Sequence, residues 1–355
     1  MQLSDRVELA LAGVRLEAPV QRSKGAGPSD DGHLWLDGGN AALPINPASP
    51  YTITDGRLHR GRIDLGIEAA PSVRPQFYDL STADGIPYNK IALLHGRDVL
   101  ATTVVQTCVR YAEDQRCRFC TIEESLNAGS TVAAKTPAQL AEVAEAAVRL
   151  DGVRQLVMTT GTTAGPDRGA RHLARCVRAV RAAVPGLPIQ VQIEPPVSDL
   201  SVIADLRAAG ATAIGIHVES LDDAIRARWM PGKSTVPLAE YERAWDEAVA
   251  VFGWNRVSTY LLIGLGEEPD DLVRGAAALI ARGVYPFVVP MRPMAGTLAR
   301  RDGAVAPPAS LVRDVTARVA SLLRAAGMTG ADQEAGCAAC GGCSALSVLE
   351  RQAGG

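Results

Sequence analysis

The segment CVRYAEDQRCRFCTIEES, residues 108–125, places three cysteines within thirteen positions of an otherwise polar and charged stretch. Eight residues separate Cys108 from Cys117, and two separate Cys117 from Cys120. Three thiolates are an odd number for a disulfide framework and one fewer than a closed zinc site uses. The segment therefore raises the possibility of a metal centre that keeps one coordination position open.

The composition of the chain indicates a soluble protein. Hydrophobic residues make up 47% of its 355 residues and charged residues 21%, and roughly 150 residues per domain gives about two domains. The net charge of -3, with no basic stripe, argues against a nucleic-acid surface. The first residues, MQLSDRVELA, are charged where a signal peptide is apolar, and no apolar run approaches the roughly 18 residues of a membrane span. We expect a cytoplasmic location, where cysteines stay reduced.

Residues 1–100 differ from the rest of the chain and predict a small β-rich module. Short alternating stretches are broken by Gly, Pro and Asp, which is typical of strands and turns. These stretches are HLWLDG (33–38), YTITDG (51–56), GRIDLGI (61–67) and RPQFYDL (74–80).

From residue 101 onward, apolar strand-like runs alternate with Ala-rich helical stretches. This rhythm predicts right-handed βαβ units and a parallel sheet. We therefore expect an α/β fold: a partial (β/α)6 barrel over residues 101–300, followed by a C-terminal helix and a Cys-rich tail over 301–355. The six predicted strands are ATTVVQ (101–106), RQLVMTT (154–160), IQVQIEP (189–195), ATAIGIHVE (211–219), VSTYLLIGL (257–265) and YPFVVPM (285–291).

The chemically reactive sequence collects after the strands. In α/β barrels the loops at the carboxyl ends of the strands carry the active site. The cysteine segment follows the first predicted strand, TTGTTAGPDRG the second, EPP the third and ESLDDAIRARWMPGKS the fourth. All of these segments should meet at one end of the barrel.

A second group of cysteines lies near the C-terminus, in GCAACGGC, as Cys337, Cys340 and Cys343. Two residues separate each neighbouring pair, and the flanking glycines allow three thiolates to converge. An auxiliary iron–sulfur cluster, a zinc site and a redox-active pair of thiols all remain open for this group. Cys176, in RHLARCVRAV, stands alone and is expected in the core.

The cysteine segment resembles the signature of the radical SAM superfamily. The interval CRFC matches the family pattern, including Phe119 before Cys120, while the first interval holds eight residues in place of the usual three. The resemblance implies that Cys108, Cys117 and Cys120 bind a [4Fe–4S] cluster that cleaves S-adenosylmethionine (SAM). The resulting 5′-deoxyadenosyl radical would abstract hydrogen from a small molecule.

Two further motifs carry the resemblance. TTGT, residues 159–162, sits where the family has a turn that binds the methionine amino group, which implicates Thr160, Gly161 and Thr162. YLLIGLGE, residues 260–267, is similar to the family's adenine-contacting pattern, with Leu262 in place of Ile and matches at Gly264 and Glu267.

The segment HVESLDDAIRARWMPGKS, residues 217–234, resembles biotin-synthase-like members. By this resemblance Glu219 would bind the ribose or the amino group of SAM, and Arg226 or Arg228 would pair with its carboxylate. The helical pattern does not decide between the two arginines. Glu194, which precedes two prolines, is a further inward-pointing candidate.

Together with GAGPSD (25–30), FYDLSTADGIPYNKIALLHG (77–96) and the cysteine-rich tail, these motifs resemble one subfamily. It is the radical SAM subfamily of nitrilase-containing bacterial gene clusters, which implies a context in nitrile or cyanide metabolism. An electron donor such as flavodoxin or ferredoxin would be its partner. A zinc-dependent barrel enzyme and a non-catalytic iron–sulfur carrier are the alternative readings of the cysteines.

Overall fold

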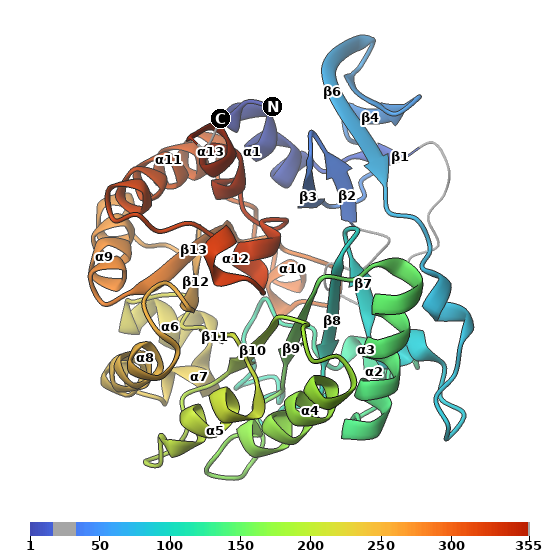
Figure 1. Ribbon diagram of the computed structural model, residues 1–355. Helices are drawn as coiled ribbons and strands as arrows, with labels where there is room; N and C mark the ends of the chain where they lie inside the picture. The colour runs from blue at the N-terminus through green and yellow to red at the C-terminus, as the bar shows by residue number, and fades with distance from the viewer. Residues whose placement is uncertain (17–32, 354–355) are drawn as a thin grey trace.

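The N-terminal part of the chain forms a small sheet with its own core (Figure 1). The computed structural model describes residues 1–16 and 33–353, so that GAGPSD (25–30) lies outside the described residues. Six strands lie in the order β1-β4-β5-β6-β2-β3, and all their pairings are antiparallel except β1 with β4. Buried apolar side chains of this sheet pack against Leu9 of helix α1. The elements are α1 (Leu3–Ala12), β1 (Arg15–Leu16), β2 (His33–Leu36), β3 (Gly39–Ala42), β4 (Tyr51–Thr54), β5 (Arg57–Arg60) and β6 (Ile63–Pro71).

One predicted strand of this region, RPQFYDL, is wrong. Gln76–Asp79 form a 3-10 helix, η2. The Asp151 carboxylate accepts hydrogen bonds from the backbone N–H groups of Gln76 (2.7 Å) and Phe77 (3.0 Å). Phe77 and Tyr78 are both buried, whereas neighbouring residues of a strand point to opposite faces. Contacts with a helix far along the chain therefore override the local alternation.

The second sheet is a partial barrel, as predicted. Its order is β13-β12-β11-β10-β9-β8-β7, and every pairing except β7 with β8 is parallel. Because β13 is an edge strand, the barrel does not close. Each of the six predicted strands is present: β8 (Val99–Thr103), β9 (Gln155–Thr159), β10 (Ile189–Ile193), β11 (Ala213–Ile216), β12 (Val257–Ile263) and β13 (Val284–Pro290), preceded by β7 (Leu93–His95).

The helices between these strands cover the outer face of the curled sheet (Figure 1). Helix α3 shows why the sequence folds this way: Thr136 and Gln139 form a capping box, and Pro137 occupies the first turn. The long helices are α3 (Pro137–Asp151), α4 (Ala170–Ala183), α5 (Ser201–Ala209), α8 (Leu238–Phe252), α9 (Pro269–Ala281) and α11 (Ala309–Ala325). The shorter ones are η3 (Tyr88–Lys90), α2 (Glu124–Asn127), α6 (Asp223–Trp229), α7 (Pro231–Ser234), α10 (Leu298–Arg301), η4 (Ala331–Gln333), α12 (Cys337–Cys340) and α13 (Leu346–Ala353).

The two ends of the described chain lie close together. Helix α1 packs against α11 and α13, and the Gln352 side chain donates to the Met1 carbonyl oxygen (3.2 Å). The barrel sheet already begins at Leu93. The division at residues 100 and 300 stays a prediction. None of the described helices has the length and apolar character needed to span a membrane.

Candidate metal and cofactor site

The cysteines of residues 108–120 lie in the loop that follows β8, at the carboxyl end of the barrel strands. All three side chains are partly exposed. The Cys108 backbone N–H donates to the Glu123 carboxylate (3.1 Å), and the Cys120 N–H donates to the Cys117 carbonyl oxygen (2.9 Å). Hydrogen bonds therefore hold the backbone at the first and at the last of the three cysteines.

The turn after β9 packs directly against the chain that leads into Cys108. Gly161 N–H donates to the Val105 carbonyl oxygen (2.8 Å), and Val109 N–H donates to that of Thr162 (2.9 Å). A Cβ atom at Gly161 would lie 2.0 Å from the Thr107 carbonyl oxygen, so only glycine fits there. The TTGT turn thus supports the cysteine loop, and its contact with a methionine amino group stays a prediction.

The three thiols of the loop share one electrostatic environment with Lys233. Burial raises the pKa of the Cys117 thiol well above its usual value and that of Cys120 to about 11. Cys108 adds to the rise at both thiols, while the Lys233 ammonium opposes it. The three thiols and Lys233 are therefore one group of interacting side chains. Metals bind the thiolate form of cysteine, and burial disfavours this charged form. A bound metal and the Lys233 ammonium would therefore together have to stabilise the thiolates.

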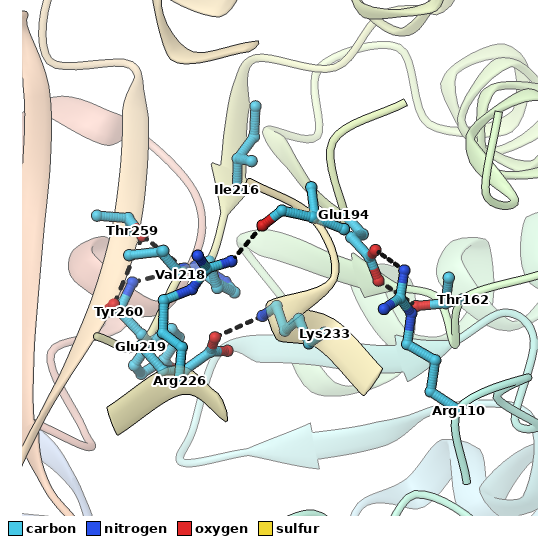
Figure 2. Close-up of polar contacts among 12 residues, drawn as sticks. Arg110, Thr162, Glu194, Ile216, Val218, Glu219, Arg226, Lys233, Thr259 and Tyr260 are labelled. Carbon is cyan, nitrogen blue, oxygen red and sulfur yellow. Dashed lines mark hydrogen bonds and ion pairs between the residues drawn. The ribbon is translucent and has the colours of Figure 1, made fainter. Parts of the chain in front are cut away.

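Lys233 is also the partner of Glu219. Its Nζ donates to Glu219 Oε2 (2.5 Å), and the two side chains are only 14% and 13% exposed (Figure 2). Glu219 has a φ of 63°, and its backbone bridges to β12 through Tyr260 and Leu262 (3.0 and 2.9 Å). This kink after β11 holds the carboxylate at the carboxyl end of the barrel, in reach of the lysine.

The two arginines predicted to bind the SAM carboxylate make other contacts in this structure, and the role expected of them stays a prediction. Arg226 is buried, and its guanidinium donates to Asp223 (2.8 Å) and to the Val236 carbonyl oxygen (2.5 Å). Arg228 is exposed, with its guanidinium 5.9 Å from the centre of the Trp229 ring. Sequence reasoning missed Lys233, although it lies in the quoted segment. The sequence signal that could have identified it is Pro231-Gly232. This pair starts a new helix, α7, and so changes the direction of the chain just before Lys233.

The eight-residue interval between Cys108 and Cys117 packs against the segment that carries Lys233. The Gln115 carbonyl oxygen accepts from Gly232 N–H (2.8 Å), and Arg110 Nη1 donates to Thr235 Oγ1 (3.0 Å). A Cβ at Gly232 would lie 2.7 Å from the Gln115 oxygen, so the backbones touch. Residues 109–116 therefore link the cysteine loop, through direct packing, to helix α7, which carries Lys233.

Glu194, at the end of β10, is fully engaged by other side chains (Figure 2). Its carboxylate accepts from Arg110 Nη2 (2.6 Å), from Thr162 Oγ1 (2.8 Å) and from Arg168. The side chain is 5% exposed, and the two arginines are 15% and 14% exposed. This arrangement joins the cysteine loop to the ends of β9 and β10 and gives Glu194 a bracing role. The cofactor contact expected of Glu194 stays a prediction.

We expect Glu194→Gln to lower the free energy of unfolding by about 3 kcal/mol, because two largely buried guanidinium groups would lose their counter-charge. Chemical denaturation followed by circular dichroism measures the change. Glu145→Gln, which removes an exposed ion pair with Arg149, is the matched control and should leave the midpoint almost unchanged. Equal midpoints for both variants would contradict the bracing role.

The segment predicted to contact the adenine of SAM, residues 260–267, ends at a cavity of about 370 Å³ between α6 and α9. Glu219 and Glu267 both line it, together with the apolar side chains of Leu221, Ile225 and Leu272. Burial raises the pKa of Glu267. The buried Leu262 and the glycine Gly264, with a φ of 100°, lie in the chain that leads to Glu267. Phe119 packs against the main core beside the cysteine loop.

Within residues 1–16 and 33–353, no group of three or more His, Cys, Asp or Glu side chains is placed to hold one metal ion. The ligands of a single zinc ion converge on one atom, whereas each thiolate of a cubane cluster binds a different iron. The donor set of three neighbouring thiols beside a cation fits the cluster by its chemistry.

Residues 113–280 match the family model described as the Radical SAM superfamily. This match supports the radical SAM superfamily. Cys117 and Cys120 lie inside the matched range and Cys108 lies just before it. The superfamily implies a radical SAM enzyme with a [4Fe–4S] cluster and SAM as cofactors, and it does not favour the zinc-enzyme and carrier alternatives.

Curated relatives of the radical SAM core are distant. The chain is 27% identical over 172 residues to lipoyl synthase of Thermus thermophilus, covering 47% of this chain and 50% of that protein. It is 25% identical over 237 residues to bacteriochlorophyllide c C-7(1)-hydroxylase of Chlorobaculum limnaeum, covering 60% of this chain and 57% of that protein. The chain therefore spans about half the length of these two relatives.

Among solved structures, the fold is similar to that of methylornithine synthase, PylB, with a TM-score of 0.45 and 16% identity. That similarity covers 62% of this chain and 60% of the other.

Proposed function

We propose that Cys108, Cys117 and Cys120 bind a [4Fe–4S] cluster and that the protein cleaves SAM reductively to abstract hydrogen from a small molecule. The observation that carries this proposal is the proximity of the three thiols to the Lys233–Glu219 pair at the carboxyl end of the barrel. When bound, the cluster and SAM supply the electron and the 5′-deoxyadenosyl radical.

Lys233 and Glu219 are suited to hold the amino-acid part of SAM. The Lys233 ammonium would pair with the SAM carboxylate, and Glu219 would accept hydrogen bonds from the amino group or from ribose hydroxyls. Both side chains are largely shielded from water, which strengthens such charged hydrogen bonds. The cavity shared by Glu219 and Glu267 has room and apolar walls for the adenosine part.

The bracing contacts complete the proposal. Arg110, Glu194 and Thr162 would keep the cysteine loop in register with the strand ends, so that cofactor and substrate meet in one orientation. The nitrilase-associated subfamily, with its context in nitrile or cyanide metabolism, is the finer part of the proposal. An electron donor such as flavodoxin or ferredoxin and a cytoplasmic location belong to it as well.

The test is anaerobic reconstitution with iron and sulfide, followed by dithionite and SAM, with 5′-deoxyadenosine quantified. We expect product from the wild-type chain and none from Cys117→Ala. Cys176→Ala is the matched control, because Cys176 is a buried core residue of α4 that belongs to neither cysteine group. Equal product from Cys117→Ala would refute the assignment of the cluster.

A further inference from the structure

The C-terminal cysteines lie at the opposite end of the barrel strands from Cys108. Gly336 N–H donates to the Gln155 side chain (2.8 Å) at the start of β9, and Cys337 N–H donates to the Gln190 side chain (3.4 Å) near the start of β10. Figure 1 shows helix α12 lying across the curled sheet. The tail therefore covers the amino-terminal half of the partial barrel.

The three tail thiols form one group. Cys337 and Cys340 stand at the two ends of the one-turn helix α12, and Cys343 follows three residues later, after Gly341 and Gly342. Residues three positions apart in a helical turn lie on the same side of it, so Cys337 and Cys340 are near neighbours. The spacing of two residues on either side of Cys340, with glycines at 336, 341 and 342, lets the chain wrap around a common centre.

Hydrogen-bond donors from three other parts of the fold point at the sulfur atoms. Gln192 Nε2 of β10 lies 3.3 Å from Cys337 Sγ, and the Tyr260 hydroxyl of β12 also bonds to Cys337. Asn40 Nδ2 of the N-terminal sheet lies 3.9 Å from Cys340 Sγ. Such donors stabilise a charged thiolate far more than a neutral thiol.

Arg6 of helix α1 is a buried cation beside these sulfurs. Only 1% of the residue is exposed; its Nη2 donates to the Gly342 carbonyl oxygen (2.5 Å), and its Nη1 has no partner among the described residues. Gly342 lies between Cys340 and Cys343, so this hydrogen bond places the guanidinium next to the loop that carries both thiols. Within residues 1–16 and 33–353 no carboxylate pairs with this guanidinium. A buried cation requires a compensating negative charge, and the tail thiols are placed to supply it as thiolates.

We infer that Cys337, Cys340 and Cys343 bind a second iron–sulfur cluster, and that Arg6 of the N-terminal module compensates its negative charge. Thiolates bound to iron provide the charge that the Arg6 guanidinium lacks, and the donors on Cys337 and Cys340 complete the surroundings of the cluster. With Gln192 and Tyr260 beside Cys337, this cluster faces the interior of the barrel, opposite the SAM end. The inference is independent of the proposed function, which concerns the first cysteine group alone.

Iron and sulfide analysis of the full chain after anaerobic reconstitution tests the binding site. We expect about eight irons per wild-type chain, and about four in both the Cys117→Ala/Cys120→Ala and the Cys340→Ala/Cys343→Ala variants. About four irons in the wild type and none in the first variant would overturn the inference, and so would zinc as the only metal of the tail. A loaded first variant and an empty second one would instead overturn the proposed function.

The reduction potential of the tail cluster tests the role of Arg6. In the Cys117→Ala/Cys120→Ala chain, a redox titration followed by electron paramagnetic resonance should show a lower potential for Arg6→Gln, because the reduced cluster carries the extra negative charge. Arg6→Lys should restore most of the shift. Arg57→Gln, an exposed residue of the same module, is the matched control. An unchanged potential in Arg6→Gln would exclude charge compensation.

Discussion

Cys108→Ala is expected to abolish assembly of the first cluster and with it the formation of 5′-deoxyadenosine. The reason is the ligand count: the widened interval, residues 109–116, contains no other cysteine or histidine. Its carboxylates are poor ligands for iron–sulfur clusters, which are held by thiolates. The variant should therefore lose about four irons and fall to background in the product assay.

The informative control for Cys108→Ala is Glu113→Ala. Glu113 occupies the position that a cysteine would hold at the ordinary family spacing, and its side chain is 71% exposed, with Arg301 as its ion-pair partner (2.7 Å). Iron content and product should stay at wild-type levels in Glu113→Ala. Retention of the cluster in Cys108→Ala, together with its loss in Glu113→Ala, would assign ligation to the family spacing.

The strands of the barrel could be predicted because each one is buried on both faces. Runs such as YPFVVPM have no competing helical period, and the intervening helices start and stop at residues with clear propensities. RPQFYDL failed because its 3-10 helix depends on Asp151, which lies more than seventy positions away. Helix α1 was missed as well, since it forms by packing against α11 and α13 at the far end of the chain.

The candidate site was predicted in its location and less well in its partners. The loops at the strand ends meet as expected, because parallel strands place their carboxyl ends at one edge. The pairing of Arg110 with Glu194 spans 84 positions, and no local pattern contains it. Lys233, the cation proposed here, was not among the candidates for a related reason: α6 ends at Trp229, so the helical spacing of this segment does not extend to Lys233.

Lys233→Met is expected to weaken SAM binding by about 10- to 100-fold, since a charge-assisted hydrogen bond is worth roughly 1.5–3 kcal/mol. Equilibrium dialysis with reconstituted protein measures the dissociation constant, and the iron content of each sample separates cofactor binding from cluster assembly. Arg228→Met is the matched control: it removes the exposed cation that the sequence suggested, and it should bind SAM normally. Lys233→Arg should recover part of the affinity, because the positive charge beside Glu219 is retained.

Normal SAM binding by Lys233→Met, together with weakened binding by Arg228→Met, would assign the SAM carboxylate contact to Arg228. It would also mean that α6 rearranges when SAM binds.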